Sequence, residues 1–162
     1  MEPLAAVAVR QAVPDDLDRI VRIEAASFEA DRFPRRNLSR MLRGGRTRFL
    51  LAGDDGYLAL CFRRGSGVAR IYSLAVRPEG RGKGVARALL QAARDTGRAA
   101  GAHTLRLEVR ESNASARRLY EEQGFRLRRR LSGYYDDGET ALQLEASLDP
   151  EDAAGAGERS AS

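Results

Sequence analysis

Cysteine, histidine and lysine are nearly absent from this chain of 162 residues. Cys61 is the only cysteine, so no internal disulfide can form, which suits the reducing cytoplasm. His103 is the only histidine, and no group of histidine, cysteine and acidic residues has the spacing of a metal site. We therefore expect a cytoplasmic protein that binds no metal ion.

Long apolar runs are also missing. None approaches the roughly 20 residues of a membrane span, and residues 1–10 lack the basic start and long apolar segment of a signal peptide. A hydrophobic content of 43% is ordinary for a globular domain, and 162 residues is short for two domains. We predict one domain over residues 1–148, away from membranes. A disordered tail rich in Ala, Gly, Ser and acidic residues is predicted over 149–162.

The charge balance is basic, with a formal net charge of +5, and Lys83 is the only lysine among 28 basic residues. An excess of arginine attracts polyanions such as RNA or the phosphates of a coenzyme. The densest cluster, Arg126–Arg130, fits either a solvated strand or a phosphate-binding patch. We favour the solvated strand, and nucleic acid is not an expected partner.

The segment Arg81-Gly82-Lys83-Gly84-Val85-Ala86 is the most informative part of the sequence. It follows an apolar run, Ile71–Val76, and opens an amphipathic stretch over residues 85–100. A strand that passes through a glycine turn into a helix leaves several N–H groups unpaired at the helix start. Those donors, the helix dipole and two cations suit a pyrophosphate. The alternative is an ordinary glycine-rich connection.

Two common phosphate-binding motifs do not fit this turn. No window reads G-x-x-x-x-G-K-S/T, and the motif G-x-G-x-x-G fails because its third glycine position is Val85 or Arg87. The pattern R-x-x-G-x-A does fit, with Arg81, Gly84 and Ala86 in its key places. In this the turn resembles the acyl-CoA pyrophosphate loop of the GNAT acetyltransferase superfamily.

A second block of sequence is similar to the C-terminal half of the RimI-like branch of that superfamily. The branch contains ribosomal-protein-alanine N-acetyltransferases and related N-terminal amine acetyltransferases. The resemblance is strong from Ile71 to Phe125 and weaker from Arg130 to Leu144. It rests on Leu107-Glu108-Val109-Arg110, Ser112-Asn113, Ala116, Leu119-Tyr120 and Gly124-Phe125.

Patterning along the chain predicts the order β-α-α-β-β-β-α-β-α-β-β. The predicted strands cover residues 7–13, 48–52, 57–63, 68–76, 104–109, 125–130 and 140–146, and the helices 14–28, 35–42, 85–100 and a short one between Asn113 and Gly124. This is the order of the GNAT fold, an α/β (α+β) class. The resemblance implies a mixed, mostly antiparallel sheet, splayed between strands 4 and 5 and flanked by about four helices. In that fold acetyl-CoA enters the split.

Two residues are the catalytic candidates of the resemblance. It implies that Glu108 accepts the proton of the acceptor amine and that Tyr120 protonates the coenzyme sulfur. The residues alone leave alternatives open, namely a strand glutamate paired with Arg106 or Arg110, and a packing aromatic with a wet hydroxyl.

Acetyl transfer needs a neutral amine, which favours one kind of acceptor. Deprotonating an α-amine at pH 7 costs roughly 1.4 kcal/mol, whereas a lysine side chain costs about 4.6 kcal/mol, so an N-terminal amine needs only a modest base. Cys61 lies in an apolar run and suits an inert buried thiol better than an acetylated intermediate. We expect direct attack in a ternary complex.

The resemblance also implies which residues contact acetyl-CoA. The backbone of the fourth strand would bind its pantetheine arm, the glycine loop its pyrophosphate, and one asparagine side chain the coenzyme. These residues are Leu74, Ala75 and Val76, then Arg81, Gly82, Lys83, Gly84, Val85 and Ala86, and finally Asn113.

In the same fold the acceptor is held by the turn after the first helix and by the last hairpin. The candidates here are Phe28, Arg32, Phe33, Tyr134 and Tyr135. Two departures stand out, because Thr140 replaces an acidic residue and Arg32-Phe33-Pro34-Arg35-Arg36 replaces an aromatic turn that often contains tryptophan. Those arginines could favour an acidic acceptor over an alanine-starting ribosomal protein, and the sequence leaves both open.

The expected function is therefore an acetyl-CoA-dependent N-acetyltransferase acting on a peptide or protein N-terminus, ribosomal proteins included. One alternative is a GNAT enzyme for a small amine or amino acid. The other is a non-catalytic module that binds acyl-CoA or nucleic acid.

Overall fold

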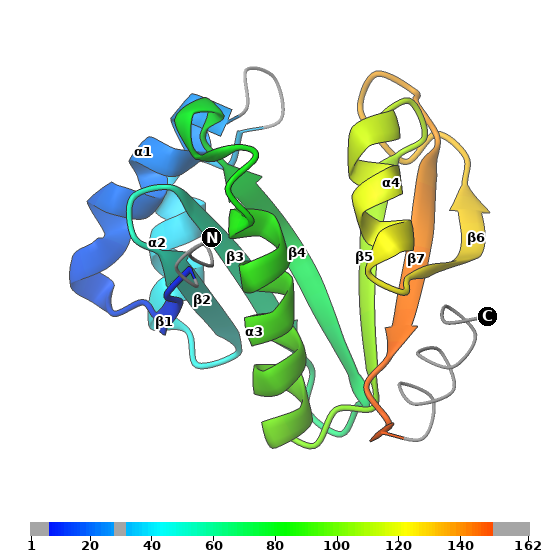
Figure 1. The fold of residues 1–162 in the computed structure, drawn as a ribbon, viewed down its shortest axis with the longest axis horizontal. Helices are drawn as coiled ribbons and strands as arrows, with labels where there is room; N and C mark the ends of the chain where they lie inside the picture. The colour runs from blue at the N-terminus through cyan, green and yellow to red at the C-terminus, as the bar shows by residue number, and fades with distance from the viewer. Residues whose placement is uncertain (1–6, 28–31, 151–162) are drawn as a thin grey trace, which may run out of the picture. The chain divides into compact units, whose positions relative to one another are not determined.

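The computed structural model describes residues 7–27 and 32–150, so Phe28 and all but the first two residues of the predicted tail lie outside it. Its elements are β1 (Arg10–Gln11), a 3₁₀ turn (Pro14–Asp16), α1 (Leu17–Ser27), α2 (Arg35–Arg43), β2 (Thr47–Ala52), β3 (Gly56–Phe62), β4 (Val68–Val76), a second 3₁₀ turn (Pro78–Gly80), α3 (Val85–Ala99), β5 (Thr104–Arg110), α4 (Ala114–Glu122), β6 (Arg126–Leu131) and β7 (Ala141–Ser147) (Figure 1). The predicted order and fold class are confirmed.

The strands form one seven-stranded sheet in the order β1-β2-β3-β4-β5-β7-β6. β4 and β5 run parallel, whereas β1–β2, β2–β3, β5–β7 and β6–β7 run antiparallel. The parallel register joins Val68–Arg70 to Thr104–Arg106. In the described ranges, no helix is both long and apolar enough to cross a membrane.

The first predicted strand is wrong in length, since only Arg10–Gln11 of the predicted 7–13 is a strand. The Val13 N–H donates to Asp16 Oδ2 at 2.8 Å and so turns away from the sheet. Hydrogen bonds from the Arg10 guanidinium, together with the Val13 N–H, lower the pKa of Asp16 to about 2 against the cost of its burial. A cap of this kind starts the helical segment and stops the strand.

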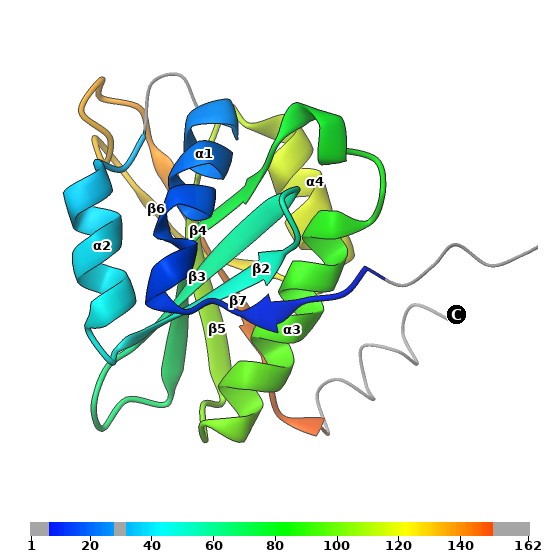
Figure 2. The same cartoon turned by 90° about the vertical axis from the view of Figure 1, so that its left-hand side faces the viewer.

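The chain divides into two compact units, and the division crosses β4 after Arg70 and α3 after Asp95. The first unit comprises the chain up to Phe62 together with Ile71–Asp95. In it, α1 and α2 lie on one face of β2 and β3, and the first turns of α3 lie on the other (Figures 1 and 2). Its core contains Ile20, Ile23, Leu38, Phe49, Leu51, Tyr57, Ala59 and Ala75.

The second unit comprises Arg63–Arg70 and the chain from Thr96 onward. Its strand β5 alternates, with Leu105, Leu107 and Val109 buried and the residues between them half-buried. Asn113 caps α4, because its side-chain oxygen accepts from the Ala116 N–H at 3.2 Å. Gly124 follows the helix with a φ of 89°, as predicted for its C′ position.

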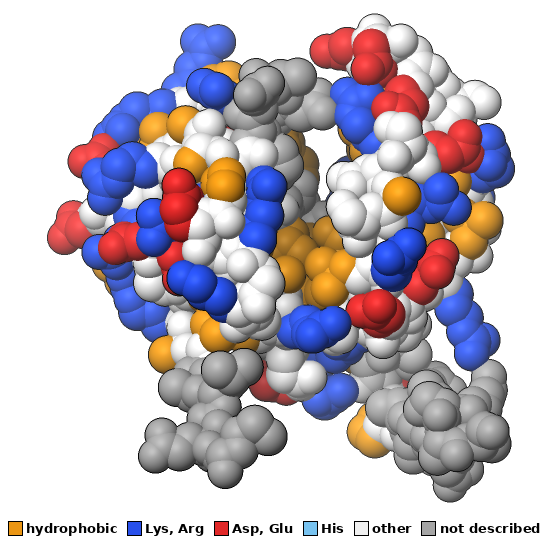
Figure 3. All heavy atoms as spheres, turned by 45° about the horizontal axis from the view of Figure 1, so that its top comes forward, with side chains coloured by type: hydrophobic (Ala, Val, Ile, Leu, Met, Phe, Trp, Pro, Cys, Tyr) orange, Lys and Arg blue, Asp and Glu red, His pale blue; other side chains and the backbone are white. Residues whose placement is uncertain are grey.

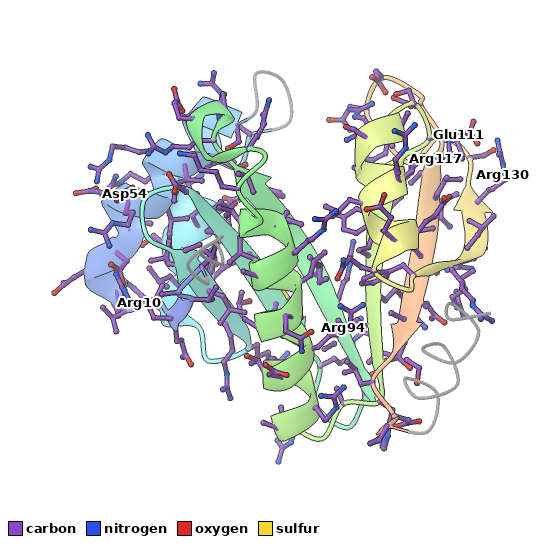
Figure 4. All side chains as sticks on the ribbon, viewed as in Figure 1. Arg10, Asp54, Arg94, Glu111, Arg117 and Arg130 are labelled. Carbon is purple, nitrogen blue, oxygen red and sulfur yellow. The ribbon has the colours of Figure 1, made fainter. Side chains whose placement is uncertain are left out.

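The arginine cluster of β6 lies on an exposed edge strand. Arg130 contacts Glu111, whose carbonyl also accepts from Arg117 at 2.9 Å (Figure 4). Arg128 pairs with Glu145 at 3.2 Å. Lys and Arg side chains are interspersed with acidic ones over the face drawn in Figure 3. Acidic partners thus offset part of the charge of the cluster, which fits the solvated strand that we favoured.

Candidate active site

The glycine loop of the first unit has the backbone that its sequence predicts. Gly82 and Gly84 have φ values of 79° and 81°, in the left-handed region that favours glycine. α3 starts directly after them at Val85, and the Gly84 carbonyl accepts from the Ala88 N–H at 3.0 Å. The first N–H groups of this helix have no partner within it and point toward the loop. The loop can therefore bind an anion.

The segment between β4 and this loop is held by an ion pair that sequence reasoning did not identify. Arg77 donates through Nε and Nη2 to Asp55 Oδ1, at 3.0 and 2.8 Å. Gly80 is packed so closely that an added Cβ would lie 2.9 Å from the Asp55 Cβ. The predicted strands 48–52 and 57–63 implied only a turn at these residues, and no sequence pattern indicated this anchor.

The other predicted coenzyme residues lie beside the loop on β4. Ala75 is fully buried, whereas Leu74 and Val76 are half-buried. Arg81 Nε lies 3.4 Å from the Val76 carbonyl and joins the loop to the end of the strand. The structure thus places Leu74–Val76 and the glycine loop in one continuous segment of the first unit, and Asn113 belongs to the second unit.

Glu108 is the centre of a polar cluster in the second unit. Only 6% of its side chain is exposed, and its Oε1 contacts the Arg70 guanidinium of β4. Gln143 Nε2 donates to Glu108 Oε2 at 3.1 Å. The Tyr134 hydroxyl lies 3.4 Å from Oε1 and accepts from Arg70 Nη2 at 2.9 Å. The carboxylate is therefore held by one cation and two neutral donors.

The alternative pairing of Glu108 with arginines of its own strand is wrong. Arg106 Nε donates to Glu145 Oε1 at 2.7 Å, and Arg110 Nη1 donates to Glu139 Oε1 at 2.9 Å. Both arginines project on the same face as Glu108, but each is paired with an acid of β7 or of the last hairpin instead. The actual partner lies on β4, 38 residues away in sequence.

Tyr120 is a buried residue of α4, with 8% of its surface exposed. Its ring packs edge-on against Phe125, with centroids 5.5 Å apart. Burial raises the pKa of the Tyr120 hydroxyl, and the nearby Tyr135 adds to this. The phenol therefore stays protonated around neutral pH and can act as a proton donor.

The two tyrosines of the last hairpin differ in their contacts. Tyr134 is 43% exposed and touches the Glu108 cluster. The Tyr135 ring lies under the Arg110 guanidinium, 4.0 Å from its centroid. Glu139 secures this hairpin, and hydrogen bonds from Ser112 and then from Arg110 lower the pKa of Glu139 to about 2. The hairpin is thus tied to the end of β5.

The predicted acceptor residues of the first unit are tied to a buried carboxylate. The Phe33 N–H donates to Glu24 Oε2 at 2.9 Å, and the Tyr57 hydroxyl donates to Oε1 at 2.5 Å. Glu24 is 2% exposed, and burial raises the pKa of its carboxyl group. The Phe33 ring stacks on Tyr72 with centroids 4.8 Å apart, and Arg32 is exposed. The sequence predicted only that Glu24 lies in the helix over residues 14–28.

The groups described above suit an enzyme that transfers a chemical group. In the first unit, a left-handed glycine loop at a helix N-terminus can bind an anion. In the second unit, a carboxylate on β5 can accept a proton and a protonated phenol on α4 can donate one. Group transfer from a phosphorylated donor uses groups of these three kinds. In the described part of the chain, no group of three His, Cys, Asp or Glu residues could hold a metal ion.

Comparison with known proteins gives the family. Residues 16–125 match the acetyltransferase (GNAT) family, so the chain belongs to that family and is an enzyme that transfers acyl groups. The match spans residues of both compact units.

Three relatives carry the comparison further. A Bacillus subtilis (strain 168) protein, provisionally named ribosomal protein bS18-alanine N-acetyltransferase, is 33% identical over 149 residues, which cover 87% of this chain and 95% of that protein. The crystal structure of the ribosomal-protein-S18-alanine N-acetyltransferase from Escherichia coli has a TM-score of 0.77 at 28% identity and covers 88% and 94% of the two chains. The crystal structure of nourseothricin acetyltransferase has a TM-score of 0.71 at 26% identity and covers 88% and 98%. The RimI-like branch predicted from sequence is confirmed.

Proposed function

We propose that this enzyme transfers the acetyl group of acetyl-CoA to the α-amine of a peptide or protein N-terminus. One observation carries the proposal: the Glu108 carboxylate and the Tyr134 hydroxyl, the candidate base and the candidate holder of the peptide backbone, meet in one polar cluster. The Bacillus subtilis and Escherichia coli relatives, both named for acetylating an alanine of a ribosomal protein, support the same kind of acceptor. We further propose that residues 1–148 act as a single domain.

The residues present suit acetyl-CoA as co-substrate. The left-handed Gly82 and Gly84 leave no side chain over the start of α3, where N–H groups and the helix dipole favour a pyrophosphate. Arg81 and Lys83 are exposed beside them and add positive charge. The backbone of Leu74, Ala75 and Val76 and the side chain of Asn113 complete the proposed set.

The chemistry assigned to the second unit is a direct attack. The neutral amine nitrogen bonds to the thioester carbon, the carbon–sulfur bond breaks, and the amine proton passes to Glu108. Tyr120 gives its proton to the departing sulfur. The contact of Glu108 with the Arg70 guanidinium suits a proton acceptor, and the raised pKa of the Tyr120 phenol suits a proton donor.

A thiol-release assay with acetyl-CoA tests this function. The acceptors are peptides that differ only in their first residues, compared with a panel of small amines and amino acids. Release with peptides alone supports the proposal. Release with small amines alone supports the second candidate, a small-molecule acetyltransferase, which the similarity to nourseothricin acetyltransferase favours. Release with neither would exclude both.

Gly84→Ala is expected to weaken acetyl-CoA binding at least about tenfold, because a left-handed alanine costs about 1–2 kcal/mol and the loop would relax away from the coenzyme. Calorimetric titration with acetyl-CoA measures the loss. The matched control is Gly65→Ala, since Gly65 has a φ of 77° and equally open surroundings in the turn before β4. The control should lose similar stability and keep its affinity. Equal affinities for both variants would contradict the proposed pyrophosphate site.

A further inference from the structure

Glu24 is a buried acid that the proposed reaction does not use. It lies in α1 and is 2% exposed. One carboxylate oxygen accepts from the Phe33 N–H at 2.9 Å, and the other accepts from the Tyr57 hydroxyl at 2.5 Å. A carboxylate is costly to remove from water, so buried ones are normally hydrogen-bonded. Both donors here lie outside α1, one on the segment before α2 and one on β3.

The hydrogen bond to Phe33 fixes the backbone just before α2. A backbone N–H cannot rotate independently of its chain, so this bond sets both the place and the direction of the residue. The Phe33 ring then stacks on Tyr72 of β4, with centroids 4.8 Å apart and an angle of 25° between the ring planes. Tyr72 is 38% exposed and Phe33 is half-buried. The stacked pair therefore exposes aromatic surface that a ligand can contact.

A second contact joins the same carboxylate to β4. The Tyr57 hydroxyl, which donates to Glu24, also lies 3.1 Å from the Ser73 Oγ. Ser73 is buried in β4, next in sequence to Tyr72. All of these residues belong to the first unit. Glu24 is thus linked to β4 by two routes, one through Phe33 and Tyr72 and the other through Tyr57 and Ser73.

We propose that Glu24 is a positioning residue for acceptor binding. It holds Phe33 against Tyr72, so that the two rings form one surface that contacts the acceptor peptide. Tyr72 thereby joins the predicted acceptor residues. Because Glu24 is buried and acts through Phe33, its loss should weaken acceptor binding and leave the chemical step in place. This inference rests on the proposed function and on the acceptor role predicted for Phe33.

Glu24→Met tests the inference, since methionine has a similar length and offers neither oxygen. For a peptide that the wild type acetylates, KM should rise about tenfold or more, because a fixed backbone donor loses its acceptor. The value of kcat should stay within about threefold, and the dissociation constant of acetyl-CoA within about twofold. Thiol release measures kcat and KM, and calorimetry measures coenzyme binding. The inhibition constant of the acetylated product peptide should rise in step with KM, which reports binding without turnover.

Asp16→Leu is the matched control. Asp16 lies in the turn before α1, is 8% exposed and also accepts from a backbone N–H, that of Val13 at 2.8 Å. Its replacement removes a buried carboxylate from the same unit without touching Phe33. It should lower the thermal stability as Glu24→Met does and leave KM within about twofold.

Glu24→Gln tests the hydrogen bond itself. The glutamine oxygen can accept from the Phe33 N–H, and its amide can donate to the Tyr57 hydroxyl, which can donate in turn to Ser73. Every partner of the network is then satisfied without the charge. KM should therefore stay within about threefold of the wild type, in contrast to Glu24→Met.

Tyr72→Leu removes the stacking partner from a partly exposed position. It should raise KM roughly 3- to 10-fold, the range expected from the loss of an aromatic pair. If Glu24 acts by holding Phe33 on Tyr72, the two changes share one effect. The double variant Glu24→Met/Tyr72→Leu should then raise KM by less than the product of the two single factors.

Four results would overturn the inference. They are a KM in Glu24→Met within about threefold of the wild type, an equal rise in Asp16→Leu, a fall in kcat without a rise in KM, or factors that multiply in the double variant. Should Glu24→Met fail to fold, an unchanged KM in Tyr72→Leu overturns it alone. In each case the wild type still acetylates peptides, so the proposed function survives. A wild type that acetylates no peptide ends the proposed function before any variant is compared.

Discussion

Glu108→Gln is expected to lower kcat/KM by about 10²-fold or more near pH 7, the usual contribution of general base catalysis. Glutamine keeps the size of the side chain and can still accept from Arg70, but it cannot take a proton from the amine. The loss should shrink as the pH rises past about 8, where the α-amine is neutral without help. The measurement is kcat/KM from pH 6 to 9.5 with the best peptide of the panel.

Glu145→Gln is the matched control for this variant. Glu145 lies on neighbouring β7 and is half-buried in an ion pair with Arg106, so its replacement also removes a carboxylate from this sheet. Its kcat/KM should stay within about threefold of the wild type, as expected for the loss of a partly exposed pair. A similar fall in both variants would point to a general effect of charge. A pH profile of Glu108→Gln that keeps the wild-type shape would remove Glu108 as the base.

The elements that the sequence predicts best are those with a strong local cause. β4 matches its prediction at both ends, because an apolar run lies between the Gly65-Ser66-Gly67 turn and Pro78. α4 begins and ends where Asn113 and Gly124 place it. The first strand was overestimated because its end depends on the side chain of Asp16, which alternation does not reveal.

The site could be predicted residue by residue, but its contacts could not. Glu108 shares a strand face with Arg106 and Arg110, so sequence alone makes them its natural partners. The register of β5 with β7 instead brings Glu145 opposite Arg106. The start of β4 then supplies Arg70 from 38 residues away. Side-chain pairs between residues so far apart in sequence depend on how the strands are arranged in the sheet. The periodicity of a single strand does not predict them.

Glu24 shows the same limit in the first unit. A glutamate at the end of an apolar stripe suggests a surface position, yet it is buried and binds the N–H of Phe33 and the hydroxyl of Tyr57. Both donors come from outside α1, so only the packed unit reveals them. A buried carboxylate with two donors fixes the segment after α1, where the acceptor residues were predicted.

Tyr120→Phe is expected to lower kcat by about 10²-fold and to leave the dissociation constant of acetyl-CoA within about twofold. The departing thiolate has a basicity typical of a thiol, with a pKa of about 8.5, so its departure gains from a proton supplied as the bond breaks. Because burial raises the pKa of Tyr120, the phenol remains a donor across the pH range in which the acceptor amine becomes neutral. Pre-steady-state and steady-state thiol release, together with calorimetry, measure the two quantities.

A second buried hydroxyl separates this catalytic role from a structural one. Tyr57→Phe also removes a buried hydroxyl, and it leaves Glu24 Oε1 without its donor, so it should cost about 1–3 kcal/mol in the free energy of unfolding. It should not reproduce the hundredfold fall in kcat. For Tyr120→Phe the opposite pattern is expected, with nearly unchanged thermal stability and a large loss of turnover. If Tyr120→Phe instead lost coenzyme affinity in proportion to rate, its hydroxyl would bind the coenzyme rather than protonate the sulfur, and the acid of this reaction would have to be sought elsewhere.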